Sequence, residues 1–297
     1  MTLYCEVLRM TPVFALATSL MWGLADFGGG LLTRRMPALT VVLVSQLLAV
    51  GALGAIVVAT GGWSEAGPQL WYAVAAGVVG PAAMLAFYKA LALGPMGVVS
   101  PVGALGSVAV PVGVGLVLGE RPGLLQVAGI AVAVAGVVLA SGPGLGGAPV
   151  QRQTLVLTLV AAFGFGSVMA LIAEASHTTT GLFLALFVQR VCNVVVGGGA
   201  LWASARRGAP ALPEGGWATI RTSLPALAFV GLADVAANGT YSVAAHHGPV
   251  TIAAVLASLY PVVTALAARG VLSERLRTVQ AAGAGLALVG TVLLATG

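Results

Sequence analysis

A long apolar stretch occurs twice in this chain, and the duplication limits the possible folds more than any other feature of the sequence. The matching landmarks lie 154 positions apart: Gly94-Pro95 with Gly248-Pro249, Glu120-Arg121 with Glu274-Arg275, and Gln126 with Gln280. Upstream, the offset is 153 for Tyr88 and Tyr241, and 143 for Trp22-Gly23 with Phe165-Gly166 and for Gln46 with Gln189. The unit is too long for a solenoid repeat. Duplication of an apolar unit is typical of secondary transporters.

The apolar character of the repeated unit indicates an integral membrane protein. Hydrophobic residues make up 59% of the chain and charged residues only 7%, whereas soluble domains carry about 25% charged residues. With about 20 residues per span, the sequence predicts ten transmembrane helices. Their expected ranges are 12–32, 38–60, 69–91, 95–118, 123–141, 154–175, 180–203, 222–244, 249–271 and 277–296.

The remaining composition argues against several other classes of protein. The net charge of +5 comes from short basic caps between apolar runs, with no dense basic stripe of the kind that binds nucleic acid. Cys5 and Cys192 are too few for a disulfide framework, and no metal-ligand spacing is present, so we expect no cofactor and no metal. Residues 1–11 are interpreted as a leader, disordered over residues 1–9 if Met10 is the true start.

The number of helices per copy determines the expected arrangement of the repeats. We place the first repeat at 12–141, a linker at 142–153 and the second repeat at 154–297. Because five helices is an odd number, two tandem copies enter the bilayer in opposite directions. Such inverted repeats place a binding site near the midplane, between the two halves. No stretch outside the membrane is long enough for a soluble domain.

Orientation in the membrane stays open. One side of the predicted bundle collects ten basic residues: Arg34, Arg35, Lys89, Arg152, Arg206, Arg207, Arg221, Arg269, Arg275 and Arg277. The other side has only Arg9 and Arg121. The positive-inside rule therefore puts both termini outside.

The ordered, duplicated motifs resemble the EamA family of the drug/metabolite transporter superfamily. The residues that carry the resemblance are Trp22-Gly23, Gly94-Pro95, Gly248-Pro249, Gly119-Glu120-Arg121 and Ser273-Glu274-Arg275. The resemblance covers the chain from about residue 11 and implies ten helices and export or exchange of small metabolites, often amino acids or amphipathic compounds. It also implies cytoplasmic termini, against the charge distribution. The family often has an arginine in the second helix of a repeat, where this chain has Arg190 in the second copy but Leu47 in the first.

Two carboxyl groups within predicted spans are the leading candidates for function, because ionisable groups in a membrane are costly and commonly functional. Asp26 follows Trp22 by four residues and shares its helix face, which suits a cationic or amino group and proton coupling. Asp234 and Asn238 have the same spacing in the eighth helix and are expected to face the substrate in the central cavity, with Asp234 as the second candidate for proton coupling. The alternative interpretations are a pair between Asp26 and Arg34 or Arg35, and interhelical packing by Asp234.

Three further polar residues and three prolines complete the candidate set. Tyr88, Lys89 and Tyr260 are expected to bind substrate, although Lys89 could instead extend to the membrane interface. We predict gating hinges at Pro101, Pro111 and Pro261, because proline frees backbone carbonyls in membrane helices. The alternative for the glycine- and proline-rich fourth helix is close packing alone.

Other polar residues are interpreted structurally. Gln46, Gln189, Arg190 and Asn193 are expected to join helices, and the Glu-Arg pairs to fix interfacial turns.

Several functions are compatible with these features. The leading hypothesis is a plasma-membrane transporter, monomeric or homodimeric, that exports or exchanges an amino acid or amphipathic compound through a central cavity. The alternative is proton-coupled efflux of organic cations or drugs. A membrane scaffold or an intramembrane enzyme is more distant, since an enzyme needs clustered catalytic groups and the chain has only eight acidic residues and three histidines.

Overall fold

A computed structural model describes residues 2–106, 109–110, 123–140, 150–176, 178–208, 210, 212–247, 253, 256–274 and 276–296. Within these residues the chain is all-helical, with ten α-helices and one short 3-10 helix. Helices satisfy their backbone hydrogen bonds internally, which a chain of this hydrophobicity requires in lipid. Among the described residues, six helices are long and apolar enough to cross a membrane: α1 from Thr11, α2, α3, α7, α8 and α9.

The helices of the first half are α1 (Thr2–Thr33), α2 (Ala38–Thr60), η1 (Gly62–Glu65), α3 (Leu70–Leu93), α4 (Met96–Ala104) and α6 (Leu124–Ala140). Those of the second half are α7 (Arg152–Ala175), α8 (Thr179–Arg206), α9 (Trp217–His247), α11 (Tyr260–Leu272) and α12 (Thr278–Thr296). Gly61 ends α2 at a φ of 65°, the left-handed conformation in which glycine is favoured after a helix.

Eight helices lie close to their expected ranges, and the structure differs from the sequence predictions in two ways. Helix α1 already begins at Thr2, within the residues 1–11 that were interpreted as a leader. The fourth and ninth helices are not the continuous helices that were predicted. Helix α4 ends at Ala104 with a turn at Leu105, and α11 begins at Tyr260 after a turn over residues 258–259.

The two interruptions occupy equivalent positions of the repeat, because Leu105 and Leu259 are 154 residues apart. The prediction that Pro261 lies in the middle of a continuous ninth helix is therefore wrong. Pro261 is in the first turn of α11, where its missing N–H has no helical partner to lose. Pro101 does lie inside α4 and is buried, whereas Pro111 lies outside the described residues.

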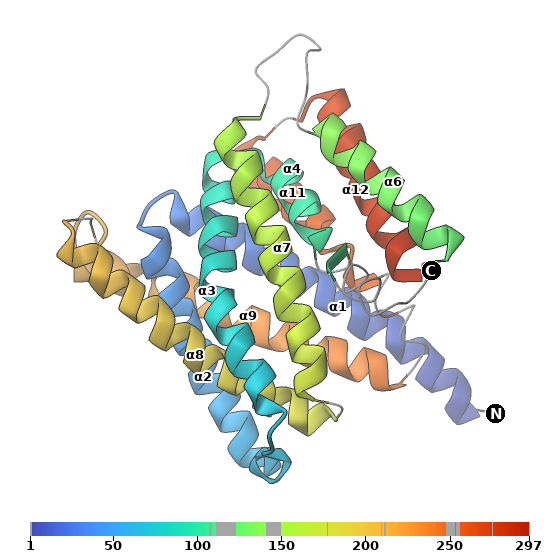
Figure 1. The fold of residues 1–297 in the computed structure, drawn as a ribbon, viewed down its shortest axis with the longest axis horizontal. Coiled ribbons are helices and arrows are strands. Elements are labelled where there is room, and N and C mark those ends of the chain that lie inside the picture. The colour runs from blue at the N-terminus through green and yellow to red at the C-terminus, as the bar shows by residue number, and fades with distance from the viewer. Residues whose placement is uncertain are drawn as a thin grey trace.

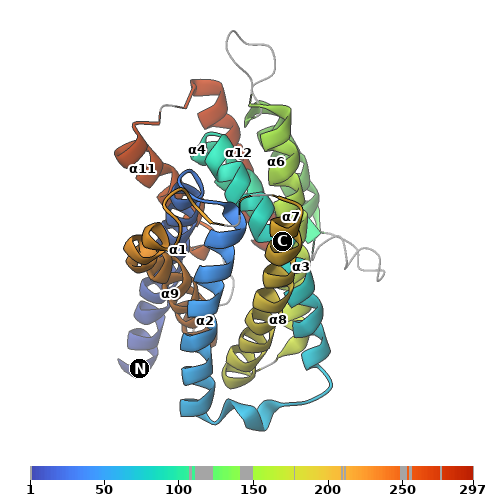
Figure 2. The ribbon, with the colours of Figure 1, turned by 90° about the vertical axis from the view of Figure 1, so that its left-hand side faces the viewer.

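Helices of the two halves pair across the molecule (Figures 1 and 2). Helix α6 packs along α12, and α2 packs against α8, so equivalent helices of the repeats are partners in both cases. The other two extensive pairs are α3 with α7 and α1 with α9. Each of these joins the first helix of one repeat to the third helix of the other, so the same pairing occurs in both directions.

A carboxylate from the second half fixes the start of α4. The Glu274 side chain accepts hydrogen bonds from the backbone N–H groups of Met96 and Gly97, both at 3.1 Å. Free N–H groups and the helix dipole favour a negative charge at this end of a helix. The repeated Glu-Arg motif was expected to fix a turn through charge pairing. In the second repeat, its glutamate instead caps a helix of the first repeat.

Candidate functional site

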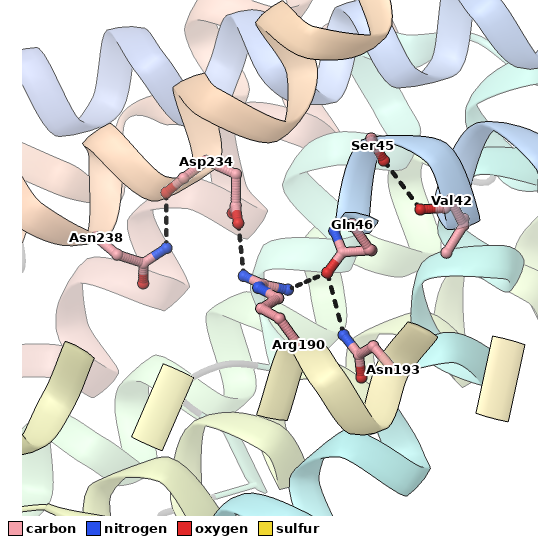
Figure 3. A network of polar contacts seen from close by, with 7 residues as sticks. All are labelled: Val42, Ser45, Gln46, Arg190, Asn193, Asp234 and Asn238. Carbon is pink, nitrogen blue, oxygen red and sulfur yellow. Dashed lines mark hydrogen bonds and ion pairs between the residues drawn. The ribbon is translucent and has the colours of Figure 1, made fainter. Parts of the chain in front are cut away.

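An arginine within helix α8 connects three helices through polar contacts (Figure 3). Arg190 of α8 forms an ion pair with Asp234 of α9, with 2.5 Å between Nη2 and Oδ2. Its Nη1 donates to Oε1 of Gln46 in α2 at 2.9 Å, and Asn193 Nδ2 donates to the same oxygen at 3.2 Å. The contacts therefore hold α2, α8 and α9 together at one level.

This network lies in the interior of the helix bundle. The Arg190 side chain is only 10% exposed and that of Asp234 24%, while Gln46 and Asn193 are buried. Each charge compensates the other, which reduces the cost of placing ionised groups within a span. Two atoms of the network, Arg190 Nε and Asn193 Oδ1, have no hydrogen-bond partner among the described residues.

Asn238 does not extend this network. Its side-chain nitrogen donates to the backbone oxygen of Asp234 at 2.7 Å, within its own helix (Figure 3). The expectation that Gln46, Arg190 and Asn193 join helices is confirmed by these contacts. Sequence reasoning did not, however, pair Arg190 with Asp234. The signal that could have identified Arg190 as a candidate functional residue is its isolation as a charged residue in the middle of an apolar span.

A second group of residues lies where α1, α9 and α11 meet. Trp22 of α1 packs against Tyr241 of α9, with ring centroids 6.0 Å apart, and edge-on against Tyr260 of α11 at 5.9 Å. Asp26 is one turn further along α1 on the same face. Aromatic faces next to a carboxylate are a favourable environment for a cation.

Asp26 is half-buried, and within the described part of the chain no ion pair involves it. The predicted alternative of a pair with Arg34 or Arg35 is therefore absent there. The Asp26 carboxyl group lies within electrostatic range of Asp234, Tyr88 and Tyr260. The aromatic group is therefore near the arginine network.

The remaining predicted site residues differ in their exposure. Tyr88 is 4% exposed and lies against Gly29 of α1, where a Cβ would collide with the tyrosine ring. Lys89, the next residue, is exposed, which favours the alternative of an interfacial lysine over a substrate contact. In the described residues, no three His, Cys, Asp or Glu side chains gather into a potential metal site.

The repeated Trp22-Gly23 and Phe165-Gly166 motifs have the same structural role. A Cβ on Gly23 would lie 2.6 Å from the backbone oxygen of Tyr260, at the interruption before α11. A Cβ on Gly166 would collide with the backbone oxygen of Gly106, the repeat equivalent of Tyr260. Each first helix therefore approaches the interrupted helix of the other repeat, and only glycine permits this distance.

The two crossings differ in their chemistry. Near Gly23 the side chains are Trp22, Asp26 and Tyr260, and Thr264 Oγ1 donates to the Gly23 oxygen at 3.0 Å. At the equivalent positions the second crossing has Phe165, Met169 and Gly106. The polar side chains are therefore concentrated at the crossing near Gly23, although the two crossings occupy equivalent positions of the repeat.

Comparisons with known proteins identify the protein family whose model this chain matches. A model of the EamA-like transporter family matches residues 9–142 and again residues 152–296. One solved structure, titled only as a crystal structure of a protein, is 18% identical with a TM-score of 0.55, and the match covers 95% of each chain. A search of curated proteins finds no match.

Proposed function

We propose that this chain, which belongs to the EamA-like transporter family, moves a small metabolite across a membrane by alternating access. Membership makes it a multi-pass membrane protein of a transporter family and leaves its substrate open. We place its ten helices in two inverted five-helix repeats, 12–141 and 154–297, joined by the linker 142–153. The reciprocal pairs α3 with α7 and α1 with α9 support this arrangement, because a pseudo-two-fold axis between the repeats would exchange the two pairs.

The substrate site is proposed between the aromatic group and the arginine network. Its members are Trp22, Asp26, Tyr88, Asp234, Asn238 and Tyr260, to which we add Tyr241 and Arg190. The observation that carries this proposal is the carboxyl group of Asp26, which has no ion-pair partner among the described residues and lies one turn from an aromatic cluster. Lys89, being exposed, is proposed to anchor the chain at the interface.

The substrate is proposed to carry a positively charged amino group that binds Asp26. An amino acid fits this description, because its carboxylate can be bound by Arg190, whose Nε has no partner in the described residues. An amphipathic amine also fits, since the aromatic rings supply apolar surface.

Proton-coupled efflux of an organic cation is the second candidate function. It is favoured by the asymmetry of the two crossings, where one side has a carboxylate and aromatic rings and the other has Phe165 and Met169. We assign the coupling proton to Asp26 before Asp234, because Asp234 is held in an ion pair with Arg190, whereas Asp26 has no ion-pair partner among the described residues.

Movement is proposed at the equivalent interruptions of the fourth and ninth helices. Turns at Leu105 and at 258–259 divide these helices next to Gly23 and Gly166, and changes of backbone angle at such points can reorient half-helices. Pro101 and Pro261 flank the interruptions, and Pro111 is assigned a similar role from the sequence. A plasma-membrane location and a monomeric or homodimeric state complete the proposal.

A binding measurement tests the site. Purified protein in detergent is heated with a panel of amino acids, amines, organic cations and simple carboxylates. Compounds that bind the folded state raise Tm by mass action. We expect amine-bearing compounds to raise Tm of the wild type but not of Asp26→Asn. If simple carboxylates without an amine stabilise both proteins equally, the proposed site is wrong.

A further inference from the structure

A cavity at one end of the bundle lies apart from the proposed substrate site. It has a volume of about 370 Å³ and is lined by residues of α2 and α8, by Leu212 and by the beginning of α9. Its walls are apolar, with Leu43, Leu201 and Ile220 among the lining residues. The volume is within the usual range for ligand pockets, and the lining suits a hydrocarbon chain rather than a polar metabolite.

The recess exists because α8 lacks side chains at this level. Residues 197–199 are all glycine, and Gly198 lines the cavity. A Cβ added at Gly198 would meet only Leu43, at 3.8 Å, and one added at Gly199 would meet nothing within 4 Å. Helices α2 and α8 therefore leave open space at this position that a larger side chain could occupy.

The opening of the cavity has the composition of a membrane interface. Trp202 and Trp217 line it and are 60% and 69% exposed, and tryptophan is enriched at the level of the lipid headgroups. The cavity is formed where α8 ends and α9 begins, so one end of an occupying chain would lie near these headgroups.

The same end of the bundle carries unpaired positive charge. The guanidinium of Arg206 lies 3.9 Å above the Trp202 ring, and Arg221 follows Trp217 by one helical turn. Arg206, Arg207 and Arg221 are exposed and form no ion pair with any described residue. Glu214 is the one acidic residue in the 204–221 segment, so this segment has an excess of positive charge.

We infer that this cavity binds an acyl chain of an anionic phospholipid whose phosphate headgroup contacts Arg206 and Arg221. The apolar walls account for the chain, and the interfacial tryptophans and arginines account for the headgroup and its charge. A neutral apolar ligand would use the walls but not the arginines, and a second copy of this chain would bring its own positive charge to the same end. This inference is independent of the transport substrate.

Native mass spectrometry tests the inference on purified full-length protein. Protein in mild detergent is incubated with equal amounts of phosphatidylglycerol and phosphatidylethanolamine, and the bound lipid is identified by mass. We expect the wild type to retain phosphatidylglycerol selectively. Gly198→Phe fills the recess and should reduce retention about tenfold, since excluding even two buried methylene groups changes affinity by that much.

Gly199→Phe is the matched control, because Gly199 is exposed and does not line the cavity. It should retain lipid as the wild type does. Arg206→Ala, an exposed change that leaves the helix packing intact, should remove the preference for phosphatidylglycerol. Equal retention by the two phenylalanine variants, no preference between the lipids, or a lipid-free dimer closed over this face would each overturn the inference.

Discussion

Asp26 and Asp234 are both carboxyl groups within apolar helices, but their surroundings differ. Asp234 is held by the Arg190 guanidinium, which in turn contacts Gln46. Asp26 has the aromatic group of Trp22 beside it and no ion-pair partner among the described residues. We therefore assign Asp234 to the polar network that forms one side of the proposed site, and Asp26 to the binding and release of a cation or proton.

Removing one member of the Arg190–Asp234 ion pair should destabilise the protein more than removing both members. Arg190→Leu leaves Asp234 as an uncompensated charge and should destabilise the protein by about 3 kcal/mol. This exceeds the roughly 0.6 kcal/mol average for interhelical hydrogen bonds in a membrane protein. The double variant Arg190→Leu with Asp234→Leu should regain most of that loss in thermal unfolding. A double variant as unstable as the single one would contradict this account of the network.

Proton coupling is a residue-scale prediction. If Asp26 carries the proton, a pH gradient should drive wild-type substrate efflux. Asp26→Asn cannot titrate, so its remaining transport should be indifferent to the gradient. Flux in proteoliposomes with and without the gradient measures this. If the pH gradient stimulates efflux equally in the two proteins, a residue other than Asp26 carries the coupling proton. If the gradient does not stimulate wild-type efflux, the protein is better explained as a uniporter or exchanger.

At the scale of helices, two features of the repeat have identifiable roles. The glycine of each Trp-Gly or Phe-Gly motif permits contact with the opposite interrupted helix, and Glu274 caps the start of α4. Both features join one half of the chain to the other. Changes at these positions should therefore alter the interface between the halves, which move against one another in the proposed transport cycle.

Gly23→Ala should interfere with the crossing of α1 and α11. The added methyl group would lie 2.5 Å from Val263 Cβ and 2.6 Å from a backbone oxygen, so the helices must separate and the Thr264 hydrogen bond to Gly23 must weaken. We expect a loss of about 1 to 3 kcal/mol, as for other overpacking changes. Gly51→Ala in α2, where a Cβ meets nothing within 4 Å, is the control and should be neutral or slightly stabilising. Similar Tm values for the two variants would refute the close-crossing explanation.

Removing the cap on α4 is the second prediction at this scale. Glu274→Ala leaves the N–H groups of Met96 and Gly97 without their acceptor, which should cost about 0.5 to 2 kcal/mol. The exposed loop residue Glu214 provides a charge-matched control, and Glu214→Ala should change Tm little. Thermal unfolding in detergent distinguishes them. An unchanged Tm for Glu274→Ala would mean that the cap contributes nothing.

At the scale of the whole molecule, the sequence predicted the all-helical fold because each span must be apolar and long enough to cross a bilayer. It also located the duplication, because Gly94 and Glu120 recur with fixed spacing. It did not locate the interruptions at Leu105 and Leu259, because leucine is not a helix breaker, although Gly103, Gly106 and Pro261 lie close by. It could not pair Arg190 with Asp234 either, because 44 residues separate them in the chain.

The central claim is transport that depends on the Asp26 carboxylate. It is tested most directly by efflux of labelled amino acids and organic cations from liposomes with wild-type protein, Asp26→Asn or no protein. We predict that an amine-bearing compound leaves wild-type liposomes, and that Asp26→Asn slows it about tenfold or more, because a charge-assisted contact is lost. Equal efflux from wild-type and Asp26→Asn liposomes, or wild-type efflux no faster than from protein-free liposomes for every compound, would contradict the claim.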